Sequence, residues 1–130
     1  AHISGTVERS VISPGVVVED GAIVRDSIIG HDSVIHAGAI VDHTILDKEV
    51  EVGVGALVGT GSDNTPNHAR PDIMNSGISI VGKRSVLPPG ITVGRNVVIG
   101  PGVKEQLYGL EALEAGQTVL PDQMPLDLFV

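Results

Sequence analysis

Residues 21–43 read GAIVRDSIIGHDSVIHAGAIVDH, and the tetrapeptide GAIV that starts at Gly21 returns at Gly38, 17 residues later. From Ser10 onward the chain divides into three blocks of this length, which align without gaps. The blocks are residues 10–26, 27–43 and 44–60. The aligned columns hold residues of one kind: Gly21, Gly38 and Gly55, then Ala22, Ala39 and Ala56, then Val24, Val41 and Val58. The chain is therefore built on a repeat of 17 residues.

Aliphatic residues recur inside each block at intervals of six, six and five residues. They are Ile12, Val18 and Val24, then Ile29, Ile35 and Val41, then Leu46, Val52 and Val58. A six-residue aliphatic period is typical of the hexapeptide form of the parallel β-helix, in which each unit is a short strand and a corner. Three units close one coil, and successive coils stack at the inter-strand spacing of ~4.8 Å. We therefore predict an all-β, hexapeptide-repeat solenoid with these residues inside.

Two other folds fit the pattern poorly. β-Branched residues and glycines are too dense for helices, and an antiparallel sandwich lacks a gapless register of this kind. The period resumes at Val81, Leu87, Val93 and Ile99, after an interruption at 61–77. That interruption holds two prolines, three asparagines and no aliphatic period. We expect it to be a loop that protrudes from one corner of the solenoid.

The sequence changes character after residue 103. Residues 104–115, KEQLYGLEALEA, contain helix formers with apolar residues at 107, 110 and 113, which predicts a short helix. The tail that follows contains two prolines and ends at Val130. We expect the β-helix to span 1–103, and the helix and tail at 104–130 to cap its open end. An alternative is that the tail docks on another domain.

Composition excludes several classes of function. The chain has 130 residues, which suits one domain, and a formal net charge of −8. No basic stripe offsets this charge, so we expect no binding to nucleic acid or to an anionic membrane. The absence of cysteine excludes disulfides and thiolate metal sites. Without a transmembrane run or a signal sequence, we expect a cytoplasmic protein. Because the repeat pattern already includes the first residues of the chain, we expect the chain to be part of a longer protein.

Two segments make a family resemblance specific. SGTVERSVISPGVVVEDGAIVRDSII (4–29) and SGISIVGKRSVLPPGITVGRNVVI (76–99) resemble the C-terminal domain of bacterial ADP-glucose pyrophosphorylase, also called glucose-1-phosphate adenylyltransferase. The resemblance covers about residues 3–103 and includes the loop at 61–77, whereas beyond 104 only EAGQTV matches weakly. It implies a left-handed parallel β-helix. It also implies a parent enzyme that makes ADP-glucose and pyrophosphate from ATP and glucose 1-phosphate in glycogen synthesis.

The resemblance further implies a division of labour. In this family an N-terminal nucleotidyltransferase domain, absent from this chain, carries catalysis with ATP and Mg²⁺, and the β-helix assembles subunits and binds anionic effectors. The chain contains no G-x-x-x-x-G-K-[ST] motif, so we expect no catalytic residue, cofactor or metal site in it. The expected partners are further copies of the chain in a homo-oligomer, the N-terminal domain and an anionic sugar-phosphate effector.

Four residues are candidates for effector binding. The stretch around Lys83 is similar to one that carries an activator-binding lysine in plant members, and the adjacent Arg84 would add a second cation for a phosphate. His68 and Arg70 lie in the expected loop, where binding residues are frequent. The alternatives are that Lys83 lies on a solvated corner and that the loop is mobile and binds nothing.

The histidines suggest two enzymatic alternatives. His31, His36 and His43 do not share a column in the 17-residue register, so we expect surface histidines rather than a three-histidine zinc site. A free-standing hexapeptide acyltransferase would need a histidine as general base, and His68 is the candidate. The remaining alternative is a scaffold domain from another sugar-nucleotide pyrophosphorylase.

Overall fold

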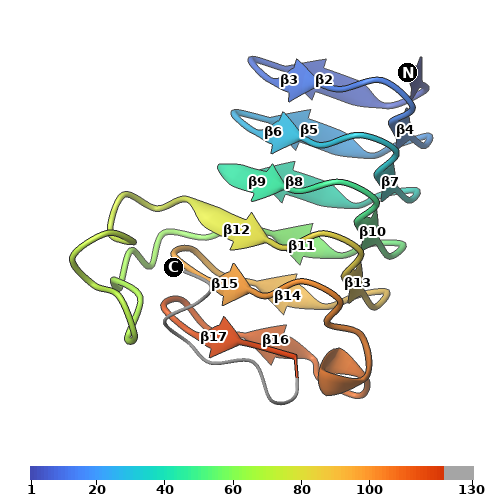
Figure 1. The fold of residues 1–130 in the computed structure, drawn as a ribbon. Coiled ribbons are helices and arrows are strands. Elements are labelled where there is room, and N and C mark those ends of the chain that lie inside the picture. The colour runs from blue at the N-terminus through green and yellow to red at the C-terminus, as the bar shows by residue number, and fades with distance from the viewer. Residues whose placement is uncertain (122–130) are drawn as a thin grey trace.

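The computed structural model describes residues 1–121 and shows a parallel β-solenoid with three flat sheets (Figure 1). Sheet A contains β1 (His2–Ile3), β4 (Val17–Val18), β7 (Val34–Ile35), β10 (Glu51–Val52) and β13 (Val86–Leu87). Sheet B contains β2 (Thr6–Glu8), β5 (Ile23–Arg25), β8 (Ile40–Asp42), β11 (Leu57–Val58), β14 (Thr92–Val93) and β16 (Ala112–Leu113). Sheet C contains β3 (Val11–Ile12), β6 (Ile28–Ile29), β9 (Thr44–Leu46), β12 (Ser79–Val81), β15 (Val98–Ile99) and β17 (Thr118–Val119).

We number the coils in chain order: coil 1 is β1–β3, coil 2 is β4–β6, coil 3 is β7–β9, coil 4 is β10–β12 and coil 5 is β13–β15. Coil 6 contributes β16 and β17. Each strand pairs in parallel with the strand one coil away, so consecutive strands of the chain always belong to different sheets. The predicted hexapeptide-repeat solenoid is confirmed. Its left-handed winding stays a prediction from the family resemblance.

The register places the aliphatic columns inside, as the 17-residue period predicts. Val18 pairs with Ile35, and Ile35 pairs with Val52, in sheet A. All three side chains are fully buried, and their counterparts in sheets B and C are buried with them. Each strand is only two or three residues long, so one side chain points inward while its neighbour points out. The core is therefore a stack of thin aliphatic layers, one for each coil.

The five-residue interval of the repeat falls at the corner between sheets B and C. Arg9, Asp26 and His43 occupy this corner in coils 1 to 3, and all three have positive φ angles between 47° and 49°. The residue that follows each of them carries a hydroxyl group. The Ser10 hydroxyl accepts from the Ser27 N–H at 3.1 Å, and the Ser27 hydroxyl accepts from the Thr44 N–H at 3.1 Å. Side-chain oxygens thus satisfy backbone donors that the tight corner leaves unpaired.

The predicted loop is confirmed. Residues 61–77 leave the solenoid between β11 and β12 and project from its side (Figure 1). The register is kept across this insertion, because Val52 still pairs with Leu87 and Val58 with Val93. No helix within residues 1–121 is long and apolar enough to cross a membrane.

The predicted helix at 104–115 is wrong. Only Glu105–Leu107 forms a helical turn, of the 3₁₀ type, and β16 and β17 then extend sheets B and C by one strand each. Leu107 and Leu113 are buried, and with Val119 they stand six residues apart, which is the solenoid period rather than a helical one. Gly109, with φ of 81°, lies between the 3₁₀ turn and β16. The rest of the expected capping tail, 122–130, lies outside the described residues.

The layered core makes a direct prediction about stability. Ile35→Ala should lower the free energy of unfolding by about 2–5 kcal/mol, because it leaves a cavity between two neighbouring coils. Ile28→Ala is the matched control, since Ile28 points outward from sheet C and is 47% exposed. Its cost should stay near the ±0.5 kcal/mol or so of surface substitutions. Urea denaturation followed by circular dichroism measures both, and equal losses would contradict the assigned register.

Candidate functional site

Two asparagines fasten the loop 61–77 onto later coils. The buried Asn67 donates from Nδ2 to the Asn96 carbonyl at 3.0 Å and to the Thr118 Oγ1 at 2.9 Å. The buried Asn96 accepts from the Gly77 N–H at 2.8 Å and donates from Nδ2 to the carbonyls of residues 64 and 65. Each asparagine therefore uses both ends of its amide. We call this arrangement the asparagine clasp; it orders the loop against the solenoid.

The clasp also places the two loop candidates. The Arg70 guanidinium contacts the Asp72 carboxylate, with an Nε–Oδ1 distance of 3.3 Å. His68 is exposed, and its N–H donates to the Gly116 carbonyl at 2.9 Å, which lays the residue along the last described corner. Arg70 thus already has a carboxylate partner, whereas the ring of His68 stays accessible to solvent.

Lys83 and Arg84 lie at a different corner, between β12 and β13, where the chain passes from sheet C to sheet A. Both side chains are exposed. Arg84 has a φ of 61°, and its Nε contacts the Glu49 carboxylate of the preceding corner at 3.1 Å. The Lys83 side chain makes no hydrogen bond or ion pair within residues 1–121. The loop leaves from the corner between sheets B and C, so the four predicted residues fall into two separate places rather than one site.

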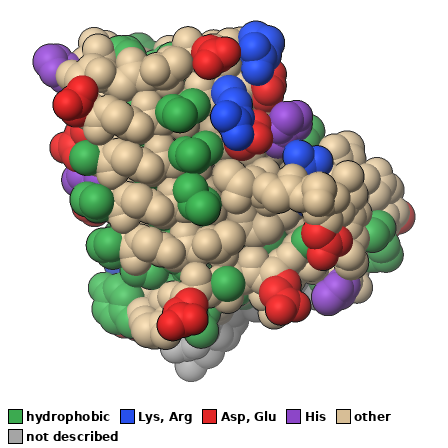
Figure 2. Space-filling view, turned by 180° about the vertical axis from the view of Figure 1, so that it is seen from behind, with side chains coloured by type: hydrophobic (Ala, Val, Ile, Leu, Met, Phe, Trp, Pro, Cys, Tyr) green, Lys and Arg blue, Asp and Glu red, His purple; other side chains and the backbone are tan. Residues whose placement is uncertain are grey.

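An alternating pattern of charges runs along the corner between sheets B and C. Glu8, Arg25 and Asp42 form one column through coils 1 to 3, and Arg9, Asp26 and His43 form the next. Basic, acidic and histidine side chains lie together on the face seen in Figure 2. Arg9 Nε contacts Asp26 Oδ1 at 2.7 Å, and Arg25 Nε contacts Asp42 Oδ2 at 3.2 Å. At these two steps, oppositely charged side chains on neighbouring coils pair with each other.

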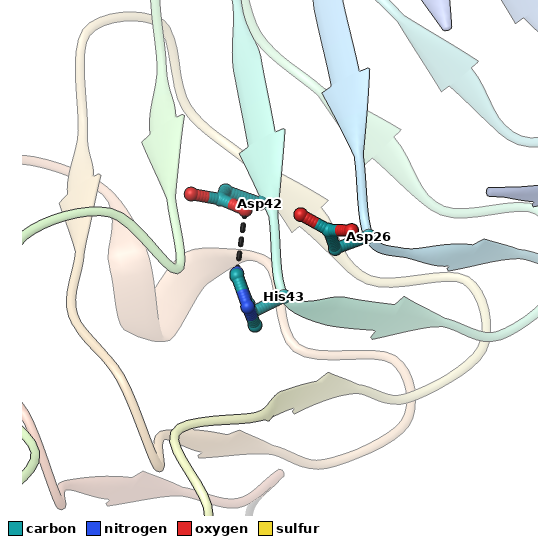
Figure 3. Close-up of side chains that lie close together, drawn as sticks. All are labelled: Asp26, Asp42 and His43. Atoms are coloured by element: carbon teal, nitrogen blue, oxygen red, sulfur yellow. Dashed lines mark hydrogen bonds and ion pairs between the residues drawn. The ribbon is translucent and has the colours of Figure 1, made fainter. Parts of the chain in front are cut away.

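One part of this pattern has the composition of a metal site. Ligand atoms of Asp26, Asp42 and His43 lie within 4.8 Å of one another, and within residues 1–121 this is the one such group of three (Figure 3). His43 Nδ1 is 2.6 Å from Asp42 Oδ1, and both carboxylates also contact arginines. The ion pairs account for the cluster, so it carries no metal assignment. The sequence analysis missed it, although the 17-residue columns contain the alternating signs.

His36 links three coils at the corner between sheets A and B. Its Nδ1 lies 2.9 Å from Glu19 Oε1 in coil 2, and its Nε2 lies 2.8 Å from Glu51 Oε1 in coil 4. An imidazole ring donates from both nitrogens only when it is protonated. The contacts with Glu51 and then Glu19 raise the pKa of His36 above its ordinary value of 6.5. His36 is half-buried, and its ring, when protonated, donates to a carboxylate on either side.

The fold and these corners define a class of protein. Over residues 1–81 the chain matches the family described as GlmU-like, C-terminal hexapeptide, and it belongs to that family. It is 52% identical over 84 residues to the glucose-1-phosphate adenylyltransferase of Thermomicrobium roseum, which is 65% of this chain and 20% of that protein. It is 39% identical over 118 residues to the enzyme of the same name from Acetivibrio thermocellus, which is 91% of this chain and 28% of that protein. The family resemblance is confirmed.

These relatives are much longer than this chain, so the match concerns only one part of each of them. The chain spans between about a fifth and just over a quarter of them. Among solved structures, the acetyltransferase domain of PglB from Neisseria gonorrhoeae superposes with a TM-score of 0.62. The superposition covers 94% of this chain and 51% of that one, at 24% identity. That likeness concerns the fold alone.

The His36 link predicts a pH dependence of stability. Because folding raises the pKa of His36, its contribution is complete below the ordinary value of 6.5 and is lost as the pH rises through the raised value. The His36 ring also lowers the pKa of Glu19, so the Glu19 contribution is present above the ordinary value of 4.5 and is lost as the pH falls through the lowered value. Urea midpoints measured between about pH 6 and pH 9 should fall more steeply for the native chain than for His36→Gln. His31→Gln is the control, and parallel curves for the native chain and His36→Gln would refute the link.

The asparagine clasp predicts a local effect. Asn67→Ala removes a buried amide and leaves its partners unsatisfied, so the free energy of unfolding should fall by about 1–3 kcal/mol. Limited proteolysis should cut the loop 61–77 faster in this variant. Asn75→Ala is the control, since Asn75 is exposed and its Nδ2 donates only to carbonyls inside the loop, at 3.0 and 3.4 Å. Equal cleavage rates in the two variants would show that Asn67 does not hold the loop.

Proposed function

We propose that this chain is the assembly and regulatory domain of a glucose-1-phosphate adenylyltransferase. The parent would convert ATP and glucose 1-phosphate into ADP-glucose and pyrophosphate for glycogen synthesis, with Mg²⁺ on the nucleotide. The observation that carries the proposal is the 39% identity over 91% of this chain to a curated enzyme with this name. Identity of this extent across a solenoid, whose coils otherwise share only a period, supports common descent rather than a shared architecture.

The proposal assigns catalysis to a domain outside this chain. The solenoid's described surface consists of flat strand faces and short corners, and no ligand-sized cavity is found among residues 1–121. Its outer faces suit assembly: Val11 and Ile28 are adjacent on sheet C and expose 61% and 47% of their surface. Ile45 and Ile80 continue the same outward column. Aliphatic columns of this kind favour association with further copies or with the catalytic domain. The role places the protein in the cytoplasm, with ATP and sugar phosphates.

The proposal also assigns the effector contact to Lys83. Of the four candidate residues, Arg84 and Arg70 have carboxylate partners at 3.1 and 3.3 Å. His68 and Lys83 remain accessible, and Lys83 offers an ammonium group with three donors and no acceptor. Regulation by an anionic sugar phosphate therefore rests chiefly on the corner between β12 and β13. The acyltransferase alternative would depend on His68 as general base, and no carboxylate within the described residues contacts its ring.

The complete gene product tests the proposal. Purified enzyme should form ADP-glucose from ATP, glucose 1-phosphate and Mg²⁺ and should sediment as an oligomer. A version that lacks residues 1–130 should sediment as a smaller species and should lose its response to 3-phosphoglycerate or fructose 1,6-bisphosphate. Lys83→Ala should weaken that response, while Lys104→Ala, another exposed lysine, should not. No ADP-glucose formation would reject the parent activity, and unchanged assembly without residues 1–130 would reject the assembly role.

A further inference from the structure

The two ends of the solenoid differ in how well their core residues are covered. In coil 1, at the N-terminal end, Ile3 is 43% exposed although it occupies the inward column of sheet A, and Val7 is only partly buried. In coil 6, at the other end, Leu107 is fully buried and Leu113 is 5% exposed. Within residues 1–121 each of these coils has a neighbour on one side only, so two bare ends should be exposed alike. The difference indicates a cover over coil 6 that coil 1 lacks.

Strands β16 and β17 also end the hydrogen-bond ladder on this side (Figure 1). In sheet B, the N–H of the first strand residue donates to the coil that follows: Leu57 to the Ile91 carbonyl at 2.9 Å, and Thr92 to the Glu111 carbonyl at 3.0 Å. The equivalent N–H on β16 belongs to Ala112, and no residue up to 121 provides its acceptor. A strand edge with free donors and acceptors is a template for pairing with more polypeptide. Coil 6 thus offers both apolar and hydrogen-bonding contacts to an additional layer.

The chain leaves coil 6 in position to supply that layer. A Cβ on Gly100 would lie 2.8 Å from the Pro121 Cδ, which places Pro121 at the corner between sheets C and A, stacked on coil 5. The next position along the path of the solenoid is sheet A of a seventh coil. Nine residues, DQMPLDLFV, follow at 122–130. In extended conformation nine residues reach ~30 Å, which is enough for the sheet A and sheet B positions.

These nine residues continue the spacing of the core. Leu107, Leu113 and Val119 stand six residues apart, and the next intervals of the repeat, five and six, lead to Met124 and Val130. Both of these residues are apolar. Met124 follows Leu107 by 17 residues, and Val130 follows Leu113 by 17. The same offset separates directly stacked core residues in sheet A of coils 2 to 4.

We propose that residues 122–130 form a partial seventh coil that closes the C-terminal end of the solenoid. Met124 packs on Leu107 in the sheet A position, and Val130 packs on Leu113 in the sheet B position. The two contacts remove from water the faces of the last core layer that have no described neighbour, which is the favourable term in any capping repeat. The inference goes beyond the proposed function and does not depend on it.

The partial coil accounts for further features of this end. Its register brings the carbonyl of residue 128 to the Ala112 N–H, by the step of 16 residues that joins the Ile40 N–H to the Ala56 carbonyl. It stops short of sheet C, in agreement with the partial exposure of Val119. Pro125 has no N–H, so the new edge offers one donor fewer to a further chain. The tail therefore both covers the core and ends the ladder.

Disulfide trapping tests the register, because the chain contains no cysteine of its own. Leu113→Cys with Val130→Cys should close an intrachain disulfide under mild oxidation. Stacked strands lie ~4.8 Å apart, within the Cα separation of about 4.4–6.8 Å that a disulfide requires. Leu113→Cys with Phe129→Cys is the matched control, and it should close at least about tenfold more slowly, since neighbouring residues of a strand point to opposite faces. Non-reducing electrophoresis and mass spectrometry identify the products.

Hydrogen exchange provides a second measurement that leaves Leu113 intact. Met124→Asp places a charge against Leu107, so coil 6 should open more often, and the Ala112 and Leu113 amides should exchange at least about tenfold faster. Gln123→Asp adds the same charge one residue away and should change these rates by less than about twofold.

Every other outcome overturns the partial coil. Equal rates of closure for the two cysteine pairs would refute the register. Disulfides between chains in place of intrachain ones would show that a second copy covers coil 6. Unchanged exchange in Met124→Asp would show that the tail does not cover coil 6 and leaves this end to another domain. None of these results bears on the enzymatic activity of the parent, so the two proposals fail separately.

Discussion

Pairing of each strand with the strand one coil away is the constraint on which the rest of this structure depends. Once Val18 pairs with Ile35 and Ile35 with Val52, every other residue of those coils acquires a fixed neighbour above and below. The aliphatic core, the hydroxyl chain through Ser27 and the opposite charges of Arg25 and Asp42 all follow from that register. The protein has few means to adjust one layer without its neighbours, since a displaced residue changes partners in two coils. The effect of a substitution therefore depends on the residues above and below it in the same column.

Features that follow the 17-residue repeat could be predicted from the sequence, whereas features outside the repeat could not. The period through Val24, Val41 and Val58 was sufficient to predict the sheets, and it also placed the loop, because the aliphatic spacing stops at 61 and resumes near 81. The helix prediction failed at Leu107, Leu110 and Leu113, because their three-residue spacing fits a helix as well as it fits half a hexapeptide unit. Burial of Leu107 and Leu113 with exposure of Leu110 shows which period applies. The roles of Asn67 and Asn96 depend on the path of the loop. The loop has no sequence repeat, so these roles could not be predicted from the period.

The candidate site shows the same division. Sequence identified candidate cations at Lys83, Arg84 and Arg70, but it did not show which of them already had carboxylate partners. Arg84 contacts Glu49 across 35 residues of sequence, a pairing that depends on the size of the loop between them.

The asparagine clasp changes which coils of the solenoid unfold locally and which unfold together. In a simple array each coil contacts only its neighbours, so the free energy behaves like a one-dimensional chain of local terms and the end coil frays first. The loop begins in coil 4, yet Asn67 contacts the carbonyl of Asn96 in coil 5 and Thr118 in coil 6. This adds an interaction between second neighbours, which makes coils 4 to 6 one cooperative unit. Coils 1 to 3 have no such bracing from the loop, so the two halves of the molecule differ in mechanical stiffness even though their strands repeat the same pattern.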